Sequence, residues 1–134
     1  MKKADIKSLD ALWATLVKET AKYQCEHCGR YDSRMEAAHI VGRRHRATRW
    51  GATIGDGYDF CGHCLCHTCH QQYDEHGPLE QDVIENTIGR ERFEVIQALA
   101  NHNVTKGQVF EFIEAELKKK GAAIIDDSPY ASTL

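Results

Sequence analysis

Hydrophobic residues recur every three or four positions near the start of the chain, a spacing typical of a helix with one buried face. This stripe within residues 5–22 consists of Ile6, Leu9, Leu12, Trp13, Leu16 and Val17. The helical period is lost between residues 25 and 69, where six glycines separate short segments that could be strands or loops. Within this region residues 35–41 (MEAAHIV) predict a strand. Residues 67–76 (HTCHQQYDEH) predict a short helix that Gly77-Pro78 ends.

The helical period returns in the C-terminal part of the chain. Two helices are predicted on either side of a break near Gly89. A third helix is predicted from a capping box formed by Thr105 and Gln108 to a stop at Gly121. The pattern predicts a single α+β domain over 1–134, with an N-terminal helix in 1–24, an irregular centre in 25–77, C-terminal helices in 78–121 and a mobile tail in 122–134.

Composition places the chain among soluble globular proteins. Of its 134 residues, 42% are hydrophobic and 28% are charged, and no segment approaches the roughly 20 apolar residues that would span a bilayer. Asp5, Lys7 and Asp10 interrupt the apolar stretch that a signal peptide would need. We therefore expect a cytoplasmic protein with no membrane association. In that reducing compartment its six cysteines would bind metal rather than form disulfides.

Four cysteines form two CxxC pairs that suit a structural zinc ion. Cys25 and Cys28 make the first pair, and Cys66 and Cys69 make the second. A two-residue spacer lets both sulfurs of one turn reach the same tetrahedral ion, and such an ion would tie together the ends of the irregular region. The segment 61–64 is also a CxxC and is an alternative second pair. We favour Cys66 and Cys69, because only they place a histidine directly after the last ligand, at the start of a helix.

A basic stretch lies in the same region, although the formal net charge of the chain is −3. The arginines between residues 34 and 50 are Arg34, Arg43, Arg44, Arg46 and Arg49, and only Glu36 opposes them. Such a stretch can hold phosphates even on an acidic protein. Taken alone, such a run of charge favours a solvated loop over a binding site.

The order of these motifs resembles the HNH (ββα-metal) endonucleases that have a four-cysteine zinc ribbon. The resemblance rests on CEHC (25–28), EAAHI (36–40) and LCHTCH (65–70). The spacing in DVIENTIGRERFEVIQALA is also similar, more weakly, to the tail of phage NinG-type recombination endonucleases. The resemblance implies a zinc-framed ββα-metal fold for residues 25–76.

The resemblance also implies roles for individual residues. His39 matches the general base that takes a proton from the attacking water, and His70 matches a ligand of a catalytic divalent metal such as Mg²⁺, Mn²⁺, Ni²⁺ or Zn²⁺. Two family positions differ, because Ala38 replaces a metal ligand and Cys61 replaces the usual asparagine. Asp74, four residues after His70 on one helix face, is our candidate for a replacement ligand. Asp59 and His63 are further candidates to replace the asparagine.

The function that the resemblance implies is hydrolysis of DNA phosphodiester bonds in a bacterial or phage-infected cell, with nicking or structure-guided cleavage. In that case Arg43, Arg44, Arg46 and Arg49 would contact phosphates. The alternative is a non-catalytic zinc-ribbon module that binds nucleic acid or protein. Protein partners could dock on the C-terminal helices, and the sequence leaves the oligomeric state open.

Overall fold

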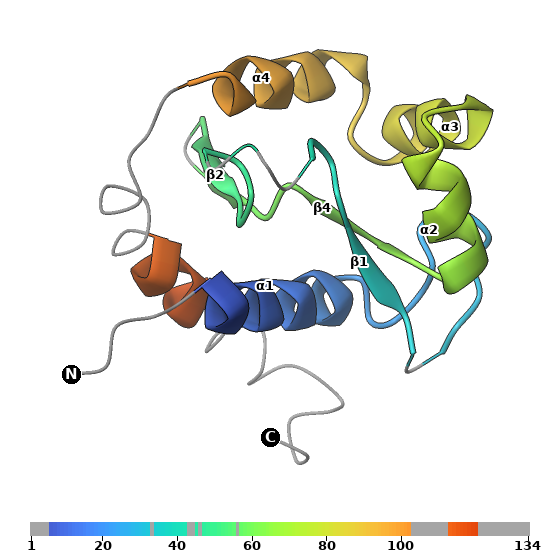
Figure 1. Cartoon of the computed structure of the whole chain (residues 1–134), viewed down its shortest axis with the longest axis horizontal. Helices are drawn as coiled ribbons and strands as arrows, with labels where there is room; N and C mark the ends of the chain where they lie inside the picture. The colour runs from blue at the N-terminus through green and yellow to red at the C-terminus, as the bar shows by residue number, and fades with distance from the viewer. Residues whose placement is uncertain are drawn as a thin grey trace.

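The computed structural model describes residues 6–32, 34–42, 45, 47–55, 57–102 and 113–120. The elements in chain order are α1 (Ile6–Thr20), β1 (Glu36–His39), β2 (Ala52–Ile54), β3 (Gly57–Asp59), β4 (Gly62–Leu65), α2 (His67–Asp74), α3 (Pro78–Thr87) and α4 (Arg90–Ala100), and residues 113–120 are also helical (Figure 1). The strands form two antiparallel two-stranded sheets, β1–β4 and β2–β3. The described residues therefore have the mixed α+β architecture that the sequence predicts.

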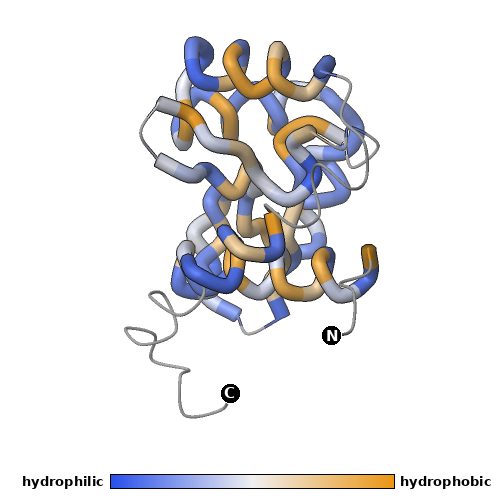
Figure 2. Tube along the Cα trace, turned by 90° about the vertical axis from the view of Figure 1, so that its left-hand side faces the viewer, coloured by the Kyte–Doolittle hydropathy of each residue, from blue (hydrophilic) through white to orange (hydrophobic). Residues whose placement is uncertain are grey.

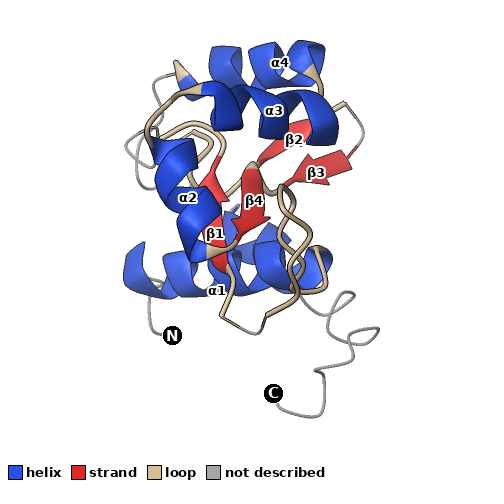
Figure 3. Ribbon diagram, turned by 90° about the vertical axis from the view of Figure 1, so that its right-hand side faces the viewer, coloured by secondary structure: helices blue, strands red, loops and turns tan. Residues whose placement is uncertain are grey.

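The β1–β4 sheet lies between α1 and α2, and this arrangement positions the candidate site (Figure 3). Its register pairs Glu36 with Leu65, Ala37 with Cys64, Ala38 with His63 and His39 with Gly62. Side chains alternate between the faces of a strand. Trp13 of α1 stacks on His39 and lies against Gly62, while Tyr73 of α2 contacts the ring of His63. The two helices therefore cover opposite faces of the sheet.

Helix α1 confirms the predicted N-terminal helix and supplies the centre of the main core. Leu9, Trp13, Leu16 and Val17 are at most 3% exposed, as expected for one apolar face packed against the sheet. Ile6, at the start of the stripe, remains 37% exposed. The main core also contains buried Ile113 and Leu117 from the helical residues 113–120.

Helices α3 and α4 confirm the two helices predicted on either side of Gly89. That glycine has a φ of 81°, a left-handed conformation that glycine adopts without a steric penalty. Both helices alternate apolar and polar residues, as the tube colours of Figure 2 show for α4 at the top. Their apolar faces cover a second core cluster, formed by Ile40, Cys61, Ile84, Phe93 and Ile96. The predicted capping box at Thr105 and Gln108 and the tail 122–134 lie outside the described residues.

Candidate metal centre and the polar row on helix α2

The four predicted cysteines come together in one cluster. Cys25 and Cys28 lie in the turns after α1, Cys66 directly precedes α2, and Cys69 lies in its first turn. Their sulfur atoms all lie within 4.8 Å of one another, and the Sγ atoms of Cys28 and Cys66 are 3.8 Å apart. In a tetrahedral zinc site with bonds of about 2.3 Å, neighbouring sulfurs are separated by about 3.8 Å. The cluster can therefore hold a structural metal ion such as zinc.

The electrostatics of the cluster also suit a cation. Burial raises the pKa of the Cys25 thiol, but backbone N–H groups of Cys28, Cys66 and His27 donate hydrogen bonds that outweigh burial and lower this pKa to about 7. Burial and the neighbouring sulfurs have the opposite effect on Cys69 and raise its pKa. The surroundings therefore favour the thiolate of Cys25, whereas the nearby sulfurs disfavour a second thiolate at Cys69. A bound cation would remove that opposition.

Cys61 and Cys64 do not belong to this cluster. Both are at most 1% exposed, and burial raises the pKa of Cys61 above its ordinary value and that of Cys64 to about 12. Among the described residues, the cysteine group 25, 28, 66 and 69 is the only set of three or more potential ligands close enough to share an ion. The alternative pairing through residues 61–64 is thus not the one that the structure adopts, because Cys64 of β4 lies in the main core and Cys61, just before β4, lies in the second core.

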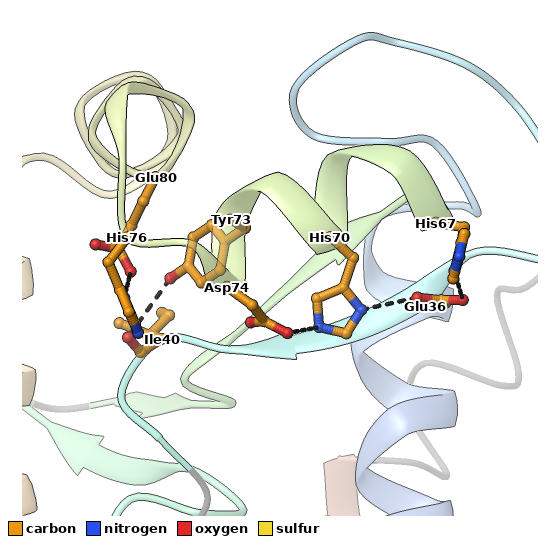
Figure 4. Close-up of polar contacts among 8 residues, drawn as sticks. All are labelled: Glu36, Ile40, His67, His70, Tyr73, Asp74, His76 and Glu80. Carbon is orange, nitrogen blue, oxygen red and sulfur yellow. Dashed lines mark hydrogen bonds and ion pairs between the residues drawn. The ribbon is translucent and has the colours of Figure 1, made fainter.

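A second group of polar side chains forms a row along α2 (Figure 4). The ring of His70 lies between two carboxylates: its Nδ1 is 2.8 Å from Oε1 of Glu36, and its Nε2 is 3.5 Å from Oδ2 of Asp74. The other oxygen of Glu36 is 3.0 Å from Nδ1 of His67. The structure thus brings together His70 and Asp74 as the sequence predicts, and it adds Glu36 from β1.

The surroundings of Glu36 favour its charged form. Partial burial disfavours its charge, but the hydrogen bonds with His70 and His67 and the electrostatic interaction with those rings outweigh burial and lower the pKa of Glu36. In the sequence, Glu36 stands out only as a charge opposing the arginines. The alternation of side chains along residues 35–41 was the signal that could have identified it, because it places Glu36 on the same strand face as Ala38.

His39 lies on the other face of β1. Its ring stacks on the indole of Trp13, with the centroids 4.1 Å apart and an interplanar angle of 14°. On this face it interacts electrostatically with Asp10 of α1 and contributes to lowering the pKa of that carboxyl. The structure therefore does not bring His39 together with His70 and Asp74. Its side chain follows the strand alternation toward α1, whereas Glu36 and Ala38 face α2.

Arg49 is committed to an intramolecular ion pair. Its guanidinium donates two hydrogen bonds to Asp10, at 3.0 and 2.7 Å, and its side chain is 18% exposed. The indole N–H of Trp50 donates to the same carboxylate, and Trp50 is 1% exposed. Arg49 therefore ties the loop before β2 to α1 and is poorly placed to contact a phosphate. Arg43, Arg44 and Arg46 lie outside the described residues.

The residues near the missing family positions have other contacts. Ala38 is fully buried beneath α2 and offers no ligand atom. Asp59 accepts hydrogen bonds from the Cys61 backbone N–H and from Arg92, at 2.7 and 2.8 Å. His63 is 1% exposed, with its Nδ1 3.6 Å from Glu26. Neither Asp59 nor His63 extends the row on α2.

Comparisons with known proteins identify no family for this chain, so a function can be argued only from the geometry described above. Within the described part of the chain, no helix combines the length and apolar character that a membrane span requires. Searches against models of protein families, curated proteins and solved structures gave no match.

Proposed function

We propose that the protein is a metal-dependent DNA endonuclease of the HNH type. The observation that carries the proposal is a pair of antiparallel strands, β1 and β4, followed by helix α2. The cysteine cluster lies at the start of α2, His70 directly follows Cys69, and Asp74 lies one helical turn after His70. That combination matches the ββα-metal arrangement that the motifs imply.

In this proposal His70 and Asp74 hold a catalytic divalent ion. Their ligand atoms lie 3.5 Å apart, close enough to share one ion, and the Asp74 side chain is 67% exposed, which leaves room for water and a phosphate. A bound Mg²⁺, Mn²⁺, Ni²⁺ or Zn²⁺ ion would stabilise the negative charge that develops on the phosphate during hydrolysis.

His39 is the proposed general base, and the proposal requires a movement of its ring. To take a proton from a water attacking a phosphate at His70 and Asp74, the imidazole must leave the face of Trp13 and turn around the end of β1. Because His39 is the last residue of β1, such a rotation does not break the strand. Arg43, Arg44 and Arg46 remain the proposed phosphate contacts, and structure-guided nicking remains the proposed specificity.

A non-catalytic zinc module is the second candidate, and two observations favour it. His39 stacks on Trp13, and Arg49 forms an ion pair with Asp10. These contacts give His39 and Arg49 structural roles. In such a module the cysteine cluster would order a surface that binds nucleic acid or protein without cleaving it.

Cleavage of supercoiled plasmid and branched DNA by the zinc-loaded protein distinguishes the two candidates. We expect nicking that depends on added Mg²⁺, Mn²⁺ or Ni²⁺, and a loss of roughly a hundredfold or more in His39→Ala, the scale of a general base. His70→Ala should also abolish nicking. His102→Ala, at an exposed position beyond α4, is the matched control and should cut at the wild-type rate.

The zinc content and circular dichroism of each variant must match the wild type for this comparison to be valid. Equal trace cleavage by wild type and His39→Ala, or DNA binding without cleavage, would contradict the nuclease proposal. Either result would favour the binding module.

A further inference from the structure

We propose that Glu36 is a positioning residue that holds the His70 ring with its Nε2 atom directed at a divalent cation shared with Asp74. This inference rests on the metal site of the proposed function and goes beyond it, because the motif resemblance gives Glu36 no role. Glu36 would be the carboxylate that compensates for the missing ligand at Ala38, acting through His70 rather than on the metal itself.

The fold sets the distance between Glu36 and α2. Glu36 begins β1 and pairs with Leu65, the residue before the zinc-cluster Cys66. The cysteine cluster includes Cys69, the residue before His70, so it fixes the first turn of α2 over this end of the sheet. The carboxylate of Glu36 consequently reaches two rings on the helix, and its side chain is 38% exposed.

The hydrogen-bond distances favour one tautomer of His70. A carboxylate oxygen accepts a hydrogen bond from an imidazole N–H, so the 2.8 Å contact with Glu36 favours a proton on Nδ1. The contact between Nε2 and Asp74 is longer, at 3.5 Å, and competes weakly for the proton. In the neutral ring Nε2 then carries the lone pair that a metal needs.

The position of that lone pair suits a cation. With ligand bonds of about 2.1 Å, two ligands of a tetrahedral ion are separated by about 3.4 Å and two neighbouring ligands of an octahedral ion by about 3.0 Å, so the 3.5 Å between His70 Nε2 and Asp74 Oδ2 fits the first directly and the second after a small approach. A carboxylate behind a metal-bound histidine raises the basicity of the ring and fixes its orientation. Figure 4 shows the His70 ring between Glu36 and Asp74, and the proposed cation would lie between His70 and Asp74.

A rival geometry places the cation between the two Nδ1 atoms that face Glu36, with His67 and His70 as ligands. Among the described residues, neither these three side chains nor the set Glu36, His70 and Asp74 has all its ligand atoms within 4.8 Å of one another, so proximity alone does not separate the two geometries. His67 is 69% exposed and contacts the far oxygen of Glu36. Removal of His67 therefore separates the two geometries, because only the rival needs its ring.

The test uses the full zinc-loaded chain and Mn²⁺ as the probe, since this hard cation competes poorly for thiolates. Long-range ¹H–¹⁵N NMR reports the tautomer of His70, and calorimetry reports Mn²⁺ affinity. We expect the Nδ1–H tautomer in the wild type. We expect Glu36→Ala to give mixed tautomers and to weaken Mn²⁺ binding by roughly tenfold to a hundredfold, the usual effect of losing such a partner.

Two further variants sharpen the result. Glu36→Gln should fall between Glu36→Ala and the wild type, because the amide oxygen can still accept the bond from Nδ1. His67→Ala should keep the wild-type tautomer and affinity. An unchanged tautomer and affinity in Glu36→Ala, a loss in His67→Ala as large as in Glu36→Ala, or no Mn²⁺ binding by the wild type would each overturn the inference.

These readouts do not depend on cleavage. If the tautomer and Mn²⁺ affinity respond to Glu36 as expected while plasmid DNA stays intact, the positioning role stands and the nuclease proposal fails. If DNA is cut but neither readout responds to Glu36, the nuclease stands and the inference about Glu36 fails.

Discussion

At the scale of single residues, one carboxylate holds three parts of the molecule together. Asp10 accepts hydrogen bonds from the guanidinium of Arg49 and the indole of Trp50, and it lies near His39. Burial raises the pKa of Asp10, but these bonds and the charges of Arg49 and His39 outweigh burial and lower it. An arginine that composition assigns to a phosphate-binding stripe is thereby used for folding.

Asp10→Asn should destabilise the protein at neutral pH. The substitution leaves the largely buried Arg49 and the Trp50 N–H without an anionic acceptor, and we expect a loss of about 1–3 kcal/mol in the free energy of unfolding. Urea denaturation measures it. Asp32→Asn is the control, because Asp32 pairs with the 87% exposed Arg34 and should change stability little. If both substitutions lowered the free energy of unfolding equally, the ion pair between Arg49 and Asp10 would stabilise the fold no more than an exposed pair does.

The stability difference between the wild type and Asp10→Asn should also depend on pH in a defined direction. Because the folded-state pKa of Asp10 is lowered, its contribution is present above the unfolded-state pKa and is lost as the pH falls through the folded-state pKa. The stability difference between wild type and Asp10→Asn should therefore shrink in acid. A difference that stays constant from neutral to strongly acidic pH would contradict this account.

At the scale of elements, the contact between α1 and the β1–β4 sheet depends on a missing side chain. Trp13 donates its indole N–H to the carbonyl of Phe60, at 2.6 Å, and lies directly over Gly62. A Cβ atom at Gly62 would lie 2.6 Å from Cζ2 of Trp13 and 2.9 Å from Cγ2 of Val17. Both contacts are shorter than carbon atoms tolerate, so β4 needs glycine here for α1 to approach.

Gly62→Ala should therefore separate α1 from the sheet and destabilise the fold by about 1–3 kcal/mol, the usual cost of overpacking. Thermal and urea unfolding would measure this loss. Gly57→Ala in β3 is the matched strand control, because no atom lies within 4 Å of its added methyl group. If Gly62→Ala were as stable as Gly57→Ala, the close approach of Trp13 would not be a real constraint.

At the scale of the whole molecule, the cysteine cluster joins the turn after α1 to the start of α2. Cys25, Cys66 and Cys69 are also members of the main core, whereas the second core beneath α3 and α4 contains none of these ligands. Loss of the metal should accordingly disrupt the main core and release α2 from the sheet.

Removal of zinc by a strong chelator should unfold this region, because a structural zinc contributes on the order of 10 kcal/mol to folding. We expect one zinc per chain in the wild type, measured by elemental analysis, and a loss of helical circular dichroism on chelation. Cys66→Ser should lose the metal, while Cys64→Ala, a buried cysteine outside the cluster, should keep it. Retention of zinc by Cys66→Ser and its loss by Cys64→Ala would restore the alternative pairing.

The sequence by itself determined the features that depend on local geometry. The helices α1, α3 and α4 appear where apolar spacing predicts them, because the period of an α-helix is a property of the local backbone. The choice of Cys66 and Cys69 was equally local, because only this pair places a histidine directly after the last ligand at the start of a helix.

Only the tertiary structure decided which face of β1 each residue occupies. Strands of four residues carry little information about their partner, and the register of β1 with β4 joins segments far apart in the chain. That register places Glu36 against His70, which is 34 positions away, and turns His39 toward Trp13. The pair Asp10 and Arg49, 39 positions apart, depends on the same packing. Such contacts arise from the burial of whole elements against one another, and no local pattern in the chain specifies them.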